Sequence, residues 1–302
     1  MRQIMAAKHN KELTCVMKVK KTTLLVFLLP AILIYLLIYA IPIGSVFVTS
    51  FFNYSITTFS FNGFGNYSQF FDGGIRSMHF GKAVENTLIW IFLQGTVHVA
   101  LGVGVALMLN RRPRGWKVVR TTYMLSNIIA TAALGLIYLN VFNAQRGVVN
   151  GIVRIFVEDF SINWFVEYPF FTVTFTWLFF AGLVTILALG EMMSISSEIY
   201  DAARVDGADG LQIDFLIVIP MIRTTIGTCV ILSVTSMLRE FDLLFMTTNG
   251  GPGFDTVSLP LLIYKTAMLD HNYGVANAYG AFTIALGVLL VVFINKAISK
   301  FE

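Results

Sequence analysis

Charged residues are scarce in this chain of 302 residues. Asp, Glu, Lys and Arg together make up 13% of the residues, whereas hydrophobic residues make up 56%. A soluble domain usually has about 25% charged residues, so this composition excludes an ordinary soluble protein and predicts an integral membrane protein with one membrane domain. The net charge of +4 is small. Because the cations flank apolar runs, the charge indicates membrane topology and argues against a nucleic-acid-binding surface.

Cysteine and the sequence motifs of catalysis are also nearly absent. The two cysteines, Cys15 and Cys229, lie far apart in the chain, which excludes a disulfide framework and a cysteine-based metal site. The sequence contains no phosphate-binding Gly-x-x-x-x-Gly-Lys-Ser/Thr loop, no serine nucleophile elbow and no His-Glu-x-x-His motif. We therefore expect that the chain is not an enzyme and binds no cofactor or metal. Any ATP hydrolysis that its activity needs would take place on another subunit.

Long apolar runs are abundant. Each run is long enough to cross about 30 Å of hydrocarbon as a helix. The first run is too long for the apolar part of a cleaved signal peptide, which has about 7–15 residues, so we favour a retained span. The sequence predicts an all-α membrane protein with six transmembrane helices, at about 24–52, 84–109, 118–142, 170–189, 224–247 and 274–298.

Most of the 21 Lys and Arg residues fall in four places. They lie in the tail 1–23, in the basic segment 111–120, near the polar segment 191–222, and at the C-terminal end. Positive residues are retained on the cytoplasmic side of a membrane. We therefore predict that the tail 1–23 and both chain ends are cytoplasmic, together with the two polar segments.

One polar stretch, Glu198–Pro220, has the sequence of a folded element rather than of a loose connection. Ser196 or Ser197 can cap a helix there, and Gly207 suits the left-handed conformation that ends one. Asp209, with a glutamine three residues later, offers a capping box for a second helix. The stretch therefore predicts two short helices around a glycine turn, although an amphipathic hairpin lying on the membrane would have the same helices.

The same stretch resembles the "EAA" signature of ABC importer permeases. The resemblance rests on Asp201-Ala202-Ala203, on Gly207 and on Ile217–Pro220, with aspartate at the position where glutamate is usual. Phe64–Tyr67, Asn86-Thr87 and the Gly-Gly-Pro run that ends at Pro252 are similar to segments of the carbohydrate-uptake, maltose-type members. The resemblance implies a type I importer permease fold in which residues 24–298 form the transmembrane permease domain and 191–222 the cytoplasmic coupling loop.

The resemblance also implies partners and a function. The chain would pair as a heterodimer with a second homologous permease subunit, and two ATP-binding subunits holding ATP and Mg would dock on it. An extracytoplasmic solute-binding protein would deliver a sugar or oligosaccharide, and the complex would lie in the bacterial cell (cytoplasmic) membrane. Asp201 would pair with the ATPase, and two alanines would allow close packing against it. The implied ATPase-coupling residues are Glu198, Asp201, Ala202, Ala203, Asp206, Gly207 and Pro220.

A second candidate site lies within the fifth run. Arg239, Glu240, Phe241 and Asp242 are adjacent there, and charges inside a membrane span normally face a cavity or pair with each other. A polar patch along a solute path is one interpretation. An Arg239–Asp242 pair, three residues apart on one helix face, is the other.

Aromatic residues of other runs could join this site. Tyr123 and Trp177 could offer ring faces to a sugar, although packing is the commoner use of aromatic residues in spans. His98, in the second run, has two interpretations as well. It is either a residue of the solute path or the partner in a hydrogen bond between helices.

Three further functions remain open from the sequence. A self-sufficient secondary transporter or channel would need inverted repeats or intramembrane ion sites, and no clear internal repeat is visible. An importer permease for a solute other than a sugar would share every feature given above. A membrane-bound enzyme is a third possibility, without a motif to support it.

Overall fold

A computed structural model describes residues 21–125, 127–178 and 180–299. Most of the predicted tail 1–23, including Cys15, lies outside these residues. The chain separates into two compact units, the first ending at Val48 and the second beginning at Thr49. Each unit is helical in its described part, as the composition predicts.

The first unit is one helical run. It consists of α2 (Lys21–Tyr35), the π-helical turn η1 (Leu36–Ala40) and α3 (Ile41–Thr49), whose last residue belongs to the second unit. Large apolar side chains on it are exposed, for example Phe27 at 80%. An apolar helix with an exposed surface of this kind suits a lipid environment.

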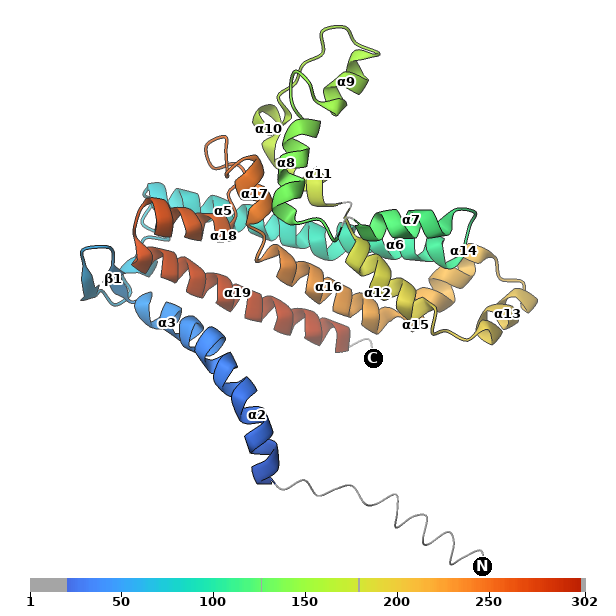
Figure 1. The fold of residues 1–302 in the computed structure, drawn as a ribbon, viewed down its shortest axis with the longest axis horizontal. Coiled ribbons are helices and arrows are strands. Elements are labelled where there is room, and N and C mark those ends of the chain that lie inside the picture. The colour runs from blue at the N-terminus through green and yellow to red at the C-terminus, as the bar shows by residue number, and fades with distance from the viewer. Residues whose placement is uncertain (1–20, 126, 179, 300–302) are drawn as a thin grey trace, which may run out of the picture. The chain divides into compact units, whose positions relative to one another are not determined.

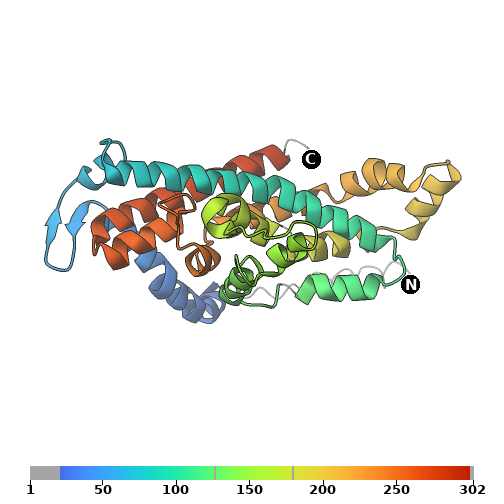
Figure 2. The same cartoon turned by 90° about the horizontal axis from the view of Figure 1, so that it is seen from above.

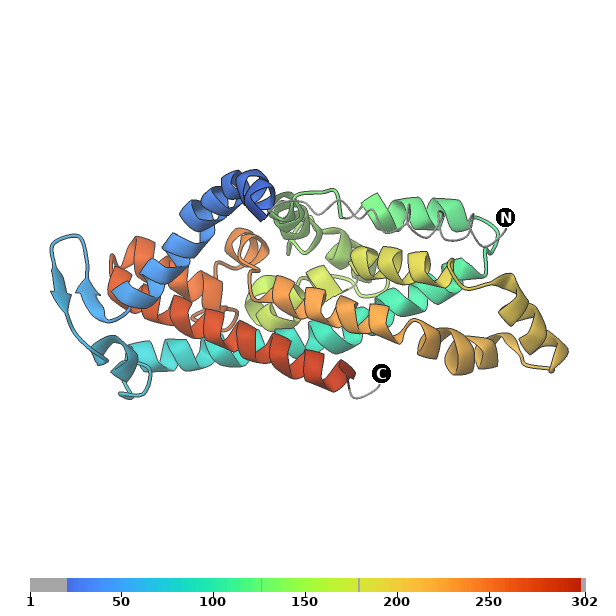
Figure 3. The same ribbon diagram turned by 90° about the horizontal axis from the view of Figure 1, so that it is seen from below.

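The second unit holds the remaining elements. Two short strands form an antiparallel pair in which Phe52 lies opposite Phe61. The strands lie at the opposite end of this unit from α13 and α14 in all three views (Figures 1, 2 and 3). The elements are β1 (Phe52–Tyr54), β2 (Phe59–Phe61), α4 (Gly65–Ser68), α5 (Ile75–Leu93), η2 (Gln94–His98), α6 (Val99–Asn110), α7 (Trp116–Leu125), α8 (Thr131–Val141), α9 (Val148–Arg154), α10 (Trp164–Glu167), α11 (Pro169–Leu178), α12 (Gly182–Met192), α13 (Ser197–Val205), α14 (Gly210–Ile213), η3 (Asp214–Val218), α15 (Ile219–Met221), α16 (Arg223–Met237), α17 (Asp242–Thr247), α18 (Leu259–Tyr264), η4 (Lys265–Leu269) and α19 (Tyr273–Ser299).

Four helices of the described chain are long and apolar enough to cross a membrane. They are Leu25–Thr49, Ile75–Asn110, Pro169–Met192 and Tyr273–Ile298. A fifth is obtained if Gly210–Met221 and Arg223–Met237, which meet at an angle of 72°, count as one span. The second of the long helices begins at Ile75, whereas the sequence interpretation began the second span at about residue 84. Polar contacts extend the helix past the apolar run, such as the Lys82–Glu85 ion pair of 3.1 Å between side chains three residues apart.

Two predicted spans are interrupted among the described residues. The run 118–142 divides into α7 and α8, and 224–247 divides into α16 and α17, whereas Pro169–Met192 forms one candidate span of 24 residues. At the break between α16 and α17, the Glu240 carboxylate accepts a hydrogen bond from the Leu243 amide at 3.2 Å and so satisfies one free amide in the first turn of α17. Neither of these two runs forms one continuous helix in the described part of the chain.

The segment 248–273, between the fifth and sixth predicted spans, contains a helix that the sequence interpretation missed. Residues Leu259–Leu269 are helical, and the Ser258 hydroxyl caps them by accepting from the Leu261 amide at 3.4 Å. Leu259 and Leu261 are fully buried there. Their packing on α5 and α19 outweighs the turn-forming glycines that precede them.

Polar side chains tie distant segments together inside the second unit. Asn86 is 1% exposed and donates to the carbonyls of Asp255 and Val257, both at 2.9 Å. The neighbouring Thr87 hydroxyl accepts from the Leu259 amide at 3.1 Å. Asn86 and Thr87, which carry part of the family resemblance, therefore fix the segment 255–259 on α5.

Candidate functional site

The polar stretch forms a helical hairpin, residues Ser196–Ile222, at one end of the second unit (Figure 1). Ser196 caps α13 by accepting from the Glu198 amide at 3.2 Å. Gly207 has a φ of +85°, which favours glycine, and it makes the turn. Asp209 and Gln212 form both bonds of the capping box, at 2.7 and 2.8 Å. The two short helices and the glycine turn are those that the sequence predicts.

The hairpin is packed firmly on the rest of the unit. Ala203, Ile213, Val218 and Ile222 are at most 6% exposed and share a hydrophobic cluster with residues of α6, α12 and α16. Ala203, for which the resemblance implies a contact with the ATPase, is thus packed against helices of its own chain.

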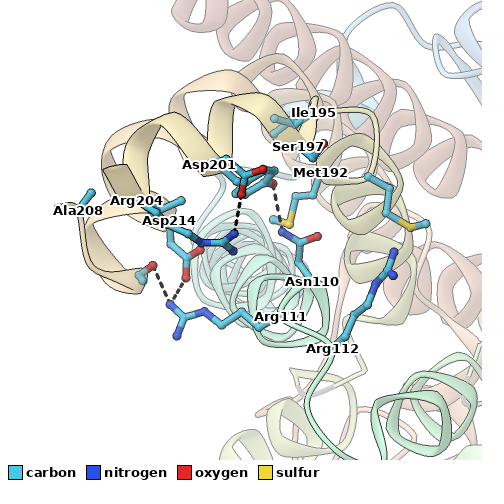
Figure 4. Close-up of a pocket in the computed structure, with 14 residues that line it drawn as sticks. Asn110, Arg111, Arg112, Met192, Ile195, Ser197, Asp201, Arg204, Ala208 and Asp214 are labelled. Atoms are coloured by element: carbon cyan, nitrogen blue, oxygen red, sulfur yellow. Dashed lines mark hydrogen bonds and ion pairs between the residues drawn. The ribbon is translucent and has the colours of Figure 1, made fainter. Parts of the chain in front are cut away.

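An arginine from another segment holds the hairpin in place. Arg111, directly after α6, donates through Nη2 to the Gly210 carbonyl at 2.9 Å and forms an ion pair with Asp214 (Figure 4). The Asp214 side chain is 9% exposed. Next to this contact the Asn110 amide donates to the Tyr200 hydroxyl at 3.2 Å. We name the Arg111–Asp214 ion pair the latch.

The sequence interpretation missed the latch. It took Arg111 only as one of several cations that mark the cytoplasmic side. The sequence feature that could have predicted this ion pair is Asp214, a single acidic residue among the apolar positions of the second helix of the hairpin. A carboxylate at such a position needs a partner.

The outer surface of the hairpin is open. Glu198, Asp201, Ala202 and Asp206 are exposed, and so are Gly207 and Pro220. Asp201 pairs with Arg204 at 3.0 Å within its own helix, with both side chains about two-thirds exposed. Four large apolar side chains also face outward, namely Val205 at 87%, Leu211 at 63%, Phe215 at 62% and Leu216 at 73%. Exposed apolar side chains clustered on a polar element are typical of a protein-binding surface.

A cavity of about 600 Å3 separates the hairpin from the ends of α6 and α12. Figure 4 shows its lining, which combines charged groups with methionines. The lining residues are Asn110, Arg111, Arg112, Met192, Met193, Ile195, Ser197, Tyr200, Asp201, Arg204, Ala208, Gly210, Ile213 and Asp214.

The second candidate set is brought together only in part. Arg239 lies in the break between α16 and α17, Asp242 is the first residue of α17, and both are exposed. No ion pair of the described residues joins them, so the pairing on one helix face was wrong. Phe241 stacks on Phe245 at 5.2 Å between ring centroids, and Tyr123 lines a separate cavity of about 120 Å3.

Glu240 and Trp177, by contrast, line one polar cavity of about 270 Å3. Its lining includes the alcohols Thr131, Thr176, Ser233 and Ser236, together with Gln94, His98 and Asn127. The sequence interpretation missed most of these residues because they come from η2, α8, α11 and α16, which only the fold brings together. The remaining lining residues are Ile129, Leu134, Phe180, Leu183, Val184, Leu187, Cys229, Leu232 and Leu243.

The π-helical turn η2 sets one wall of this polar cavity. It begins at Gln94 and ends at His98, and such turns are frequent at functional sites. His98 Nδ1 lies 3.0 Å from the Leu178 carbonyl. A carbonyl only accepts, so this nitrogen carries the proton. His98 thus makes the expected bond between helices and also lines the cavity.

Comparison with known proteins identifies the family. Residues 98–301 match the binding-protein-dependent transport system inner membrane component family. The chain belongs to this family, whose members are membrane translocation components, and it is a multi-pass protein of the cell membrane.

Relatives and solved structures agree with this assignment. A sulfoquinovosyl glycerol transport system permease protein of Agrobacterium fabrum is 29% identical over 274 residues, which cover 87% of each chain. A multiple sugar-binding transport system permease protein of Streptococcus mutans is 29% identical over 283 residues, covering 91% of this chain and 95% of its own.

The crystal structure of a bacterial alginate ABC transporter in complex with an alginate pentasaccharide-bound periplasmic protein contains a similar chain. The TM-score is 0.79 at 22% identity, over 92% of this chain and 94% of that one. This likeness concerns the fold, and it confirms the ABC importer permease fold expected from the sequence.

Proposed function

We propose that this chain forms half of the translocation path of an ATP-driven, binding-protein-dependent importer for a sugar or oligosaccharide. The helical hairpin would dock into an ATP-binding subunit and transmit its movement to the path. The observation that carries this proposal is the combination of a hairpin buried on one side and an exposed, partly apolar surface on the other. A rigid projection of this kind suits force transfer better than a flexible loop.

The connections of the hairpin support the coupling role. The latch joins it to the end of α6, and α6 continues directly from η2, which carries Gln94 and His98. The other end of the hairpin leads through Ile222 into α16, which carries Ser233 and Ser236. A displacement of the hairpin would therefore move two walls of the polar cavity. Of the coupling residues inferred from the sequence, Glu198, Asp201, Ala202, Asp206 and Gly207 would face the ATPase.

The assembly follows from the family and from exposed apolar faces. We infer a heterodimer with a second permease subunit, two ATP-binding subunits that hold ATP and Mg, and a solute-binding protein outside the membrane. Six spans within residues 24–298, with the tail 1–23 and both ends cytoplasmic, complete the proposed topology. The last part of α19 exposes Leu289 at 67% and Phe293 at 72%, and these side chains would contact lipid or the partner permease.

A saccharide is the solute that the polar cavity supports best. Its alcohols, amides, imidazole and indole offer donors and acceptors beside aromatic surface. The names of both relatives refer to sugar-type solutes, sulfoquinovosyl glycerol in one and multiple sugars in the other. The solute of this chain would belong to the same broad class.

The test is reconstitution of the chain in vesicles with its co-expressed subunits. We expect uptake that requires ATP, the binding protein and the ATPase. A cysteine at Asp206 should cross-link to the ATPase, whereas a matched cysteine at the exposed Phe61, at the other end of the unit, should not. Uptake by the chain alone, driven by an ion gradient, would instead establish a secondary transporter.

A further inference from the structure

Two buried polar atoms, which belong to residues that line the polar cavity, have no hydrogen-bond partner among the described residues. They are Gln94 Oε1 and Trp177 Nε1, and each residue is only 9% exposed. A buried polar group without a partner costs about 1–3 kcal/mol, so such groups usually face a ligand or water. Both atoms belong to residues that line the same cavity.

The two atoms have opposite requirements. The Gln94 oxygen only accepts a hydrogen bond, and the Trp177 nitrogen only donates one. A hydroxyl group can satisfy both atoms because it donates and accepts. A carboxylate or a sulfonate has no proton to donate and would leave Gln94 Oε1 unsatisfied.

The charge of the cavity points in the same direction. Glu240 lines it, and among the described lining residues there is no lysine or arginine to balance an anionic solute. Arg239 follows directly in the chain but is exposed and does not belong to the lining. Two like charges about 6 Å apart, at an effective dielectric constant of about 20, repel each other enough to weaken binding by about 100-fold.

We propose that this cavity selects uncharged saccharides and rejects saccharides that carry a carboxylate or sulfonate. The proposal rests on the proposed function, since it names the charge class of the solute. Glu240 repels the anion, and Gln94 and Trp177, which line the same cavity, favour hydroxyl groups as hydrogen-bond partners. His98, whose Nδ1 is committed to the Leu178 carbonyl, also lines the cavity.

The experiment compares two matched pools of ligands. One pool contains neutral oligosaccharides, and the other contains the same oligosaccharides oxidised at C6 to uronic acids. Both are offered to the assembled importer, purified with its co-expressed subunits and freed of binding protein, at pH 8 so that histidine side chains are uncharged. Native mass spectrometry and binding titration measure what is retained and how tightly.

Glu240→Gln is the informative variant. Glutamine keeps a side-chain oxygen that can accept from the Leu243 amide, so the start of α17 is preserved. Glu158→Gln is the matched control, because Glu158 is exposed and lies outside the cavity. We expect the wild type to bind neutral oligosaccharides at least 30-fold more tightly than their uronates. Glu240→Gln should reduce this ratio at least tenfold, and Glu158→Gln should leave it unchanged.

The possible results separate the two proposals. Uronates bound as tightly as neutral sugars by the wild type, or a ratio that Glu240→Gln leaves unchanged, would overturn the charge selection and leave the sugar function standing. Retention of neither pool, together with ATP-driven uptake of some other solute, would overturn the sugar function. Retention of the neutral pool alone, with the ratio reduced by Glu240→Gln, supports both.

Discussion

The latch gives the sharpest test of how the hairpin is held. Arg111→Ala leaves the Asp214 carboxylate, 9% exposed, without its cation and removes the bond to the Gly210 carbonyl. Loss of one partner of a fully buried pair costs about 3–5 kcal/mol, and an exposed pair contributes about 0–1 kcal/mol. Since the Arg111 side chain is 48% exposed, we expect an intermediate cost of about 2 kcal/mol, confined to the hairpin.

The assay is hydrogen exchange of the hairpin amides in the assembled complex. A cost of about 2 kcal/mol corresponds to an opening equilibrium, and hence an exchange rate, about 30-fold higher. Solute-stimulated ATPase activity should fall in the same variant, while membrane insertion and exchange in α19 should not change.

A double-mutant cycle separates the latch from general charge effects. Arg111→Ala, Asp214→Ala and the double variant should show a coupling energy of about 1–2 kcal/mol. The control is Arg114→Ala, which changes a cation of the same basic segment. Equal effects of Arg111→Ala and Arg114→Ala, or additive single effects, would refute the reasoning.

Three other substitutions test separate parts of the structure. Gly207→Pro should abolish uptake and the coupling of ATP hydrolysis, because proline cannot adopt the φ of +85° found there. The control Gly207→Ala should lower the stability of the hairpin by only about 1 kcal/mol. Correct membrane insertion with wild-type uptake by the proline variant would remove the coupling assignment. Trp177→Phe should lower the affinity for the solute about tenfold by removing the unpartnered nitrogen. Asp242→Ala, at an exposed position outside the cavity, should change the affinity less than threefold in the same titration. A larger loss of affinity in Asp242→Ala than in Trp177→Phe would contradict the cavity assignment. Asn86→Ala should destabilise the complex by about 2 kcal/mol, because the two carbonyls that lie 2.9 Å from the Asn86 amide lose their donor. Thermal inactivation in detergent measures this loss of stability. Unchanged inactivation would show that water replaces the amide.

The local structure of the hairpin was readable from the sequence. Caps at Ser196 and Asp209 and the turn at Gly207 depend on contacts between residues two or three positions apart. Such contacts form in almost any context, so their residue types predict them. The spacing of small residues around Asp201 gave the family for the same reason, because it describes one continuous segment.

Helix continuity was not readable in the same way. Apolar composition gave long runs, but the ends of α7 and α16 depend on where neighbouring helices pack and on which backbone groups find partners. The Leu259–Leu269 helix looked like a loop because its burial on α5 and α19 is a property of the whole unit.

The tertiary structure alone decided which side chains act together. Arg111 and Asp214 are 103 residues apart in the chain, and Asn86 bonds to carbonyls 169 and 171 residues away. Gln94 and Trp177 line one cavity although they come from different spans. The sequence by itself determined a membrane protein of a recognisable transporter family with a folded polar hairpin. The latch and the polar cavity required the structure, because contacts over such distances depend on the register of packed helices, which no local preference specifies.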